Sequence, residues 1–381
     1  MNRNGMVMLG VLALALGGGT ASGQVRLENV SITMGVGGEV YGSDGNFLSI
    51  AVPQVDSTDS ALGASGEMGA NGRLIFMAGN GRSLSTDFDF GMRQFWTDGF
   101  QARNYAPREL SGRVQADYRQ RLGGGTLLIV PSLDSRHIAD RPPLPLYLAP
   151  GYSAGAVVAN YSRALATDMA FYGQLTGETK DYTADLPALD DLDRRSAGLE
   201  AGVQMFFRGR PETRDPEIRD QSTLRFFGTY LHHSYPKQGE GLLRRDNAAR
   251  IGGEFTLDRR DTKGFQLALR AHGTRSRSNS RRVDYNAGRI EVEGSVELGE
   301  DTQLDLQGLW AVKRYINQQD FLIPGEEADN ATIVFAQVTR FLRDGVRAGI
   351  GGGWRRAETN FSGAYYQRFS MSFSLTVSPR F

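Results

Sequence analysis

The sequence has no cysteine among its 381 residues. This absence excludes disulfides, thiolate metal sites and a lipid anchor attached through cysteine. The chain also lacks an excess of charge of either sign, because 43 Lys and Arg balance 43 Asp and Glu. A balanced charge gives no support to a nucleic-acid partner. Composition therefore argues against a disulfide-stabilised protein, a thiolate metalloprotein, a lipoprotein and a nucleic-acid-binding protein.

Long hydrophobic runs are missing after residue 24, where no stretch approaches the ~18–20 apolar residues that a membrane-spanning helix needs. The amino end is different: residues 2–4 are weakly basic, residues 6–16 are apolar, and residues 21–23 are small. This arrangement is typical of a secretory signal peptide. We expect a signal peptide at 1–23 and one domain at 24–381.

Histidine is scarce, with four in the chain, and no spacing brings several together as metal ligands. The pair His232 and Ser234 shares one face of a strand, yet side chains two residues apart lie about 6–7 Å from one another. A nucleophile and its base must be closer than that. The sequence therefore predicts no catalytic, metal or cofactor site, and no enzyme.

At its carboxyl end the chain has a strict alternation of apolar and polar residues. Apolar Met371, Phe373, Leu375 and Val377 alternate with serines and a threonine, and the chain stops at Phe381. Period-two alternation gives a strand one apolar and one polar face. This end resembles the terminal strand of Gram-negative outer-membrane β-barrel proteins. That resemblance implies that Phe381 is part of the signal read by the barrel-insertion machinery.

The same alternation recurs along the whole chain and predicts an all-β fold, a single transmembrane antiparallel up-and-down β-barrel. Short connections alternate with long ones, as in barrels of that class. The one exception is the long, charged connection 209–221, which falls among the short ones. About sixteen strands are expected, with fourteen as the alternative, near 29–43, 64–78, 83–96, 107–121, 126–137, 151–163, 168–181, 193–208, 222–235, 245–258, 264–278, 284–298, 302–315, 329–342, 346–360 and 367–381.

A mean hydropathy of −0.36 does not oppose this prediction. A barrel hides its apolar band within alternation, so its average stays unremarkable. A secreted β-sandwich or propeller is the alternative, although those folds rarely fill the polar face with so many charges. Aromatic residues near the expected strand ends suit two interfacial girdles. At the long-loop end these are Phe95, Trp96, Tyr235, Tyr315 and Phe361, and at the other end Phe207, Phe265, Phe341 and Phe381.

The polar face of each strand would line the lumen. Candidate pore-lining residues of both signs are Arg93, Arg113, Arg119, Arg270, Arg289, Glu291, Glu293, Glu297 and Asp305. The acidic members belong to two neighbouring strands, about half a circuit from Arg93, Arg113 and Arg119. Two interpretations stay open. Opposed charges across the pore would orient polar solutes, or each charge would pair with a neighbour and stiffen the wall.

Residues 138–150 form a candidate constriction loop, stiffened by four prolines. Its members Pro142, Leu144, Leu146, Tyr147 and Leu148 include apolar side chains that are unfavourable to leave in water. General porins are similar in folding their third loop into the pore. Packing against a neighbouring loop or subunit is the alternative.

The most consistent function is a porin-like passive channel for small polar solutes in the Gram-negative outer membrane. Its partners would be outer-membrane lipid and lipopolysaccharide, the insertion machinery and those solutes, and a homo-oligomer is an open alternative. Residues 343–356 also resemble the barrel end of surface-lipoprotein assembly modifiers. That resemblance implies an export or assembly barrel for lipoprotein or polysaccharide. A structural or adhesion barrel without conduction is the third class.

Overall fold

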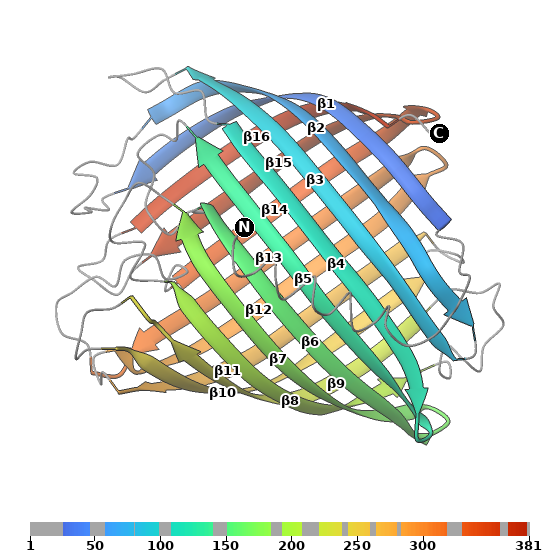
Figure 1. The fold of residues 1–381 in the computed structure, drawn as a ribbon. Helices are drawn as coiled ribbons and strands as arrows, with labels where there is room; N and C mark the ends of the chain where they lie inside the picture. Colours follow the sequence, from blue (N-terminus) through green and yellow to red (C-terminus); the bar gives the residue numbers. More distant parts are fainter. Residues whose placement is uncertain are drawn as a thin grey trace.

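The protein is a closed antiparallel β-barrel of sixteen strands in a computed structural model, with β1 hydrogen-bonded to β16 (Figure 1). The structure describes residues 26–45, 58–79, 81–98, 108–139, 151–183, 193–207, 221–237, 243–259, 264–279, 283–317, 330–358 and 365–378. Each strand pairs with its sequence neighbours. The strands are β1 Arg26–Gly45, β2 Thr58–Gly79, β3 Arg82–Asp98, β4 Arg108–Leu122, β5 Gly125–Ala139, β6 Gly151–Ala166, β7 Met169–Thr183, β8 Arg194–Phe206, β9 Gln221–Ser234, β10 Arg245–Arg259, β11 Phe265–Ser278, β12 Tyr285–Gly299, β13 Thr302–Tyr315, β14 Asn330–Arg343, β15 Val346–Glu358 and β16 Tyr365–Val377.

The predicted all-β barrel of sixteen strands is confirmed, and the alternative of fourteen is wrong. The largest error at the start of a strand concerns β2, which begins at Thr58 rather than near residue 64. Its first residues do not alternate clearly, so only pairing with β1 reveals them. That pairing carries a register irregularity between Tyr41 and Ser43. Within the described residues, no helix is long and apolar enough to cross a membrane.

The alternation divides the wall into two faces. One face carries apolar side chains that are open to the surroundings: Ile251 is 77% exposed, Met371 64% and Phe373 62%. Few of the described apolar side chains are buried, so the barrel has no conventional hydrophobic core. Side chains on the convex side of a curved sheet spread apart and stay accessible, whereas those on the concave side converge. The exposed apolar face is therefore the outer one, and the polar face points inward.

The two ends of the barrel differ in their connections. At one end, called the short-turn end, tight turns join β4 to β5 and β14 to β15. In the first of these, Leu122 pairs with Gly125 across Gly123 and Gly124, whose φ angles are 57° and 78°. A two-residue hairpin of this kind requires positive φ at both positions, which glycine adopts without strain. The opposite end is called the long-loop end.

The aromatic girdle expected at the long-loop end is partly wrong. Trp96 faces outward and is 53% exposed. Phe95 lies on the inner face with Arg93, whose guanidinium carbon is 5.7 Å from the ring centroid. Tyr235 is buried. Tyr315 points inward with Lys313, whose Nζ lies 4.8 Å from its ring centroid. A position near a strand end does not determine the face, which residue parity sets. Phe361 lies outside the described residues.

Candidate pore wall

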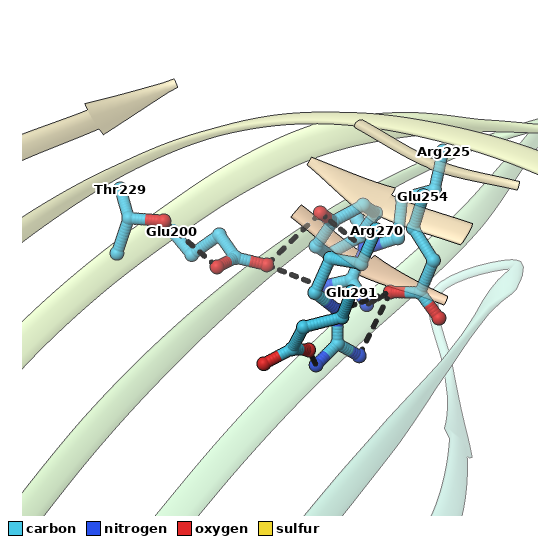
Figure 2. A network of polar contacts seen from close by, with 7 residues as sticks. Glu200, Arg225, Thr229, Glu254, Arg270 and Glu291 are labelled. Carbon is cyan, nitrogen blue, oxygen red and sulfur yellow. Dashed lines mark hydrogen bonds and ion pairs between the residues drawn. The ribbon is translucent and has the colours of Figure 1, made fainter. Parts of the chain in front are cut away.

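A row of charges of alternating sign crosses the inner face of four adjacent strands. Arg225 of β9 stands directly opposite Glu254 of β10, which is opposite Arg270 of β11, which in turn is opposite Glu291 of β12. Opposite charges at directly paired positions stabilise a sheet. With Tyr172 of β7, Glu200 of β8 and Thr229 of β9, these residues form what we call the wall network (Figure 2).

Glu200 is the most enclosed carboxylate of the wall network, with a side chain only 14% exposed. It forms an ion pair with Arg225 and accepts hydrogen bonds from Tyr172 Oη at 3.0 Å and Thr229 Oγ1 at 2.8 Å. The guanidinium of Arg225 also donates to Tyr172 Oη at 2.6 Å and lies 4.4 Å from that ring's centroid. These contacts join three strands and fix both charged groups.

The network continues through longer contacts. Glu254 Oε2 lies 3.8 Å from Arg225 Nη1 and 3.1 Å from Arg270 Nη2, so it bridges two guanidinium groups. Arg270 Nη1 lies 3.6 Å from Glu291 Oε2, and Arg289 forms an ion pair with the same carboxylate. Figure 2 shows Arg270 between Glu254 and Glu291. Positive and negative charges therefore follow one another through the wall network from β8 to β12.

A second charged region covers the inner face of β2 to β5. Arg93 Nη2 contacts Glu67 Oε2 at 2.7 Å. Arg73 binds both oxygens of Asp87, at 2.7 and 2.9 Å. Arg113 stands opposite Asp134 in register and donates to Gln115 Oε1 at 2.9 Å. A hollow of about 490 Å³ opens beside Arg73, Asp87 and Arg113. As on β9 to β12, the charges occur in neighbouring pairs.

The structure brings some candidate pore-lining residues into pairs and leaves others apart. Arg93, Arg270, Arg289 and Glu291 are paired with neighbours, and Asp305 Oδ1 accepts from Gln303 at 2.7 Å. Arg119, Glu293 and Glu297 are exposed and have no ion-pair partner among the described side chains. For Arg93, Arg270, Arg289 and Glu291, the geometry thus favours the second interpretation, in which each charge pairs with a neighbour and stiffens the wall. Whether any of these residues lines a conducting pore stays a prediction.

A buried polar cluster lies on the inner side of β8 to β10 at the long-loop end. Arg244 and Asp246 form an ion pair of 2.6 Å although their side chains are only 4% and 3% exposed. His233 Nδ1 lies 2.7 Å from Ser196 Oγ. Asp193 accepts a hydrogen bond from the Tyr182 backbone N–H and forms an ion pair with Lys237 Nζ. Such enclosed, paired groups favour a single arrangement of the side chains at the mouth of the barrel.

His232 and Ser234 do not form a catalytic pair. His232 points outward and its Nδ1 lies 2.9 Å from Asn247 Oδ1. His233 points inward to Ser196, as adjacent residues of a strand must face opposite sides. Among the described residues, no group of three or more His, Asp or Glu side chains could hold a metal ion.

Sequence reasoning missed several members of the wall. Glu67 and Arg73 lie on β2, where the alternation of apolar and polar residues is hard to recognise in the sequence. Tyr172 and Thr229 are not among the candidate pore-lining residues because they carry no charge. For Tyr172, the alternation of β7 is a usable signal, because Tyr172 lies on the same polar face of the strand as Gln174. The signal peptide at 1–23, the constriction residues Pro142, Leu144, Leu146, Tyr147 and Leu148, and the insertion residue Phe381 lie outside the described residues.

Comparison with known proteins finds solved structures to which the chain is similar. Neither a family model nor a curated protein sequence matches the chain. The solved structure of Pseudomonas aeruginosa OprD is 9% identical with a TM-score of 0.43, and the match covers 95% of this chain and 98% of that one. OmpT of Vibrio cholerae is 9% identical with a TM-score of 0.41, covering 93% and 100%.

The outer-membrane channel DcaP of Acinetobacter baumannii is 12% identical with a TM-score of 0.37, covering 95% of this chain and 99% of that one. Similarity of this degree concerns the fold and supports no inference about a solute or a partner.

Proposed function

We propose that the chain is an outer-membrane β-barrel that works as a passive channel for small polar solutes. The observation that carries this proposal is the division of a closed barrel into an apolar outer face and a charged inner face. Exposed apolar residues recur around the ring, for example Leu175 at 60%, Ile251 at 77% and Ile350 at 61%. A protein surrounded by water rarely exposes so large an apolar surface, whereas a barrel in lipid requires it.

The inner face supports the channel part of the proposal. A barrel of sixteen strands leaves an aqueous space unless loops fill it. Charges of both signs on the wall network and on β2 to β5 keep that space polar. Because most of them are paired, the wall holds a fixed pattern of dipoles instead of a strong field of one sign. Such a wall suits small polar solutes better than it suits strongly selective ion transport.

The remaining expectations belong to the same proposal. Residues 138–150, including Pro142, Leu144 and Tyr147, would narrow the lumen, and Phe381 would serve insertion. A signal peptide at 1–23 would direct export. Lipopolysaccharide, the insertion machinery and small solutes would be the partners, without nucleic acid and without a cofactor. Assembly into a homo-oligomer is compatible with this function.

Charge on the inner wall should set ion preference. We expect Glu291→Gln, Glu293→Gln and Asp305→Asn together to shift the reversal potential toward anions, because lining charge controls which ions enter. The loss of Glu291 also leaves Arg270 and Arg289 without their shared carboxylate. The measurement is the reversal potential across a planar bilayer under a salt gradient.

The matched control removes the same number of negative charges from exposed residues in the tight turns at the short-turn end. These substitutions are Glu300→Gln, Asp301→Asn and Asp344→Asn. Their reversal potential should stay close to that of the unmodified protein. Equal shifts from both triple variants would show that overall charge, and not the inner wall, sets the preference.

A further inference from the structure

Arginines gather on the outer face of the barrel at the long-loop end. They occupy the strands from β8 to β13 and are all exposed. We call this group the rim patch, and its members are Arg195, Arg245, Arg275, Arg277 and Arg314. Neither the wall network nor the buried polar cluster uses any of them.

Parity places the rim patch on the same face as the apolar band. Arg195 shares the outward register of β8 with Leu199, which is 54% exposed. Arg245 faces outward from β10 on the same side as Ile251. Arg314 faces outward from β13 on the same side as Trp310, which is 51% exposed. The arginines therefore continue the outer apolar face toward the long-loop end, where a membrane's hydrocarbon gives way to its headgroups.

Neutral polar residues stand between the arginines. Arg195 and Arg245 are both opposite Ser234, from the two sides of β9. Arg275 and Arg314 are both opposite Asn286, from the two sides of β12. Cations two strands apart lie roughly 10 Å from one another in the sheet. The spacing suits several separate anionic groups better than one.

No ion pair neutralises the rim patch among the described residues. On the inner face, by contrast, Arg225 and Arg270 each contact carboxylates. On the outer face of the opposite wall, Asp44 accepts hydrogen bonds from Tyr365 and Gln367. Five cations without a carboxylate partner repel one another and favour the arrival of an anion. The patch is thus complementary to a negatively charged surface that begins just beyond the apolar band.

We propose that the rim patch binds the phosphate groups of outer-leaflet lipid. Guanidinium groups bind phosphate through paired hydrogen bonds, which makes arginine well suited to this chemistry. Acyl chains of the same lipid would pack on the apolar band beneath, against Leu199 and Ile251. A free phosphate ion would make no favourable contact with the apolar band. Because the rim patch and the apolar band are continuous, together they favour a lipid over a free phosphate. This inference rests on the proposed outer-membrane location and does not depend on conduction.

The test uses the full-length refolded protein in detergent micelles that contain bisphosphorylated lipid A. Bound lipid is counted by native mass spectrometry as its concentration is varied. We expect the triple variant Arg245→Gln, Arg275→Gln, Arg277→Gln to bind lipid A roughly tenfold or more weakly, because each arginine near a charged membrane surface contributes to attraction. Correct folding is verified by heat-modifiable electrophoretic mobility.

The matched control is Arg108→Gln, Arg163→Gln, Arg340→Gln, three exposed outward arginines that lie outside the rim patch. It should bind lipid A as the unmodified protein does. Equal weakening in both triple variants, or full binding by the patch variant, would overturn the proposal. Displacement of lipid A by inorganic phosphate alone would also overturn it, in favour of a free anion.

A second variant covers the case in which the triple variant does not fold. Arg195→Gln, Arg314→Gln removes the two ends of the rim patch and should weaken lipid A binding several-fold. Unchanged binding by this folded double variant would count against the proposal. Absence of conductance in a planar bilayer would contradict the proposed channel but would not affect lipid A binding. Failure of the channel proposal and failure of the lipid-binding proposal can therefore be distinguished.

Discussion

Arginine in place of Leu306 should destabilise the barrel in lipid by about 2–4 kcal/mol, the cost of a cation near the middle of the membrane. Leu306 faces outward from β13 and is 46% exposed. Its direct neighbours in register are Gly294 and Ala336, which offer no charge to an incoming guanidinium. The free energy of unfolding is measured by urea titration of the protein refolded into lipid vesicles.

The neighbouring residue supplies the control. Gln307 faces inward and stands opposite Glu293 on β12, so an arginine there would meet water and a carboxylate. Gln307→Arg should change the free energy of unfolding by less than about 1 kcal/mol. Val292→Arg, on the outer face of β12, should behave like Leu306→Arg. Equal costs for Leu306→Arg and Gln307→Arg would mean that the outward and inward faces are assigned incorrectly.

Replacing Glu200 with alanine should cost about 1–3 kcal/mol of barrel stability, because the change leaves partly buried donors without their acceptor. Tyr172 and Thr229 would each lose a hydrogen bond. Among the carboxylates that the structure describes, Arg225 would keep only Glu254, at 3.8 Å, as a partner. The cost stays below that of a fully buried ion pair, since the Arg225 side chain is 29% exposed. The same vesicle titration measures it.

Two further variants separate the network from simple loss of charge. Glu293→Ala removes an exposed carboxylate of the inner face that has no ion-pair partner among the described residues, and should cost less than about 0.5 kcal/mol. The double variant Glu200→Ala, Arg225→Ala should cost less than the two single changes added together, by about 0.5–3 kcal/mol. Strict additivity would show that Glu200 and Arg225 act independently.

Much of the fold could be predicted from the sequence because apolar and polar residues alternate along most of the strands. Ile290, Val292 and Leu298 of β12 alternate with charged residues, so the strand and its faces follow directly. The start of β2 could not be predicted in this way. Thr58 enters the sheet through its pairing with Ser43, a contact between segments that local pattern does not encode.

The charges of the inner wall could be predicted as a set but not as pairs. Parity alone puts Arg225, Glu254 and Arg270 on one face. Their alternation across strands depends on register, which places Arg225 opposite Glu254 and Glu254 opposite Arg270. The sequence left two interpretations open, charges opposed across the pore or charges paired with their neighbours. In the structure Glu291 is shared by Arg270 and Arg289, so on β12 the charges are paired locally.

Single-channel recording in a planar bilayer tests the central claim most directly. The refolded, unmodified protein should give stable open steps of conductance that grow with salt concentration, as an aqueous lumen with a polar wall requires. An export or adhesion barrel would instead keep a closed baseline. A silent trace from protein whose folding is verified by heat-modifiable mobility would contradict the channel.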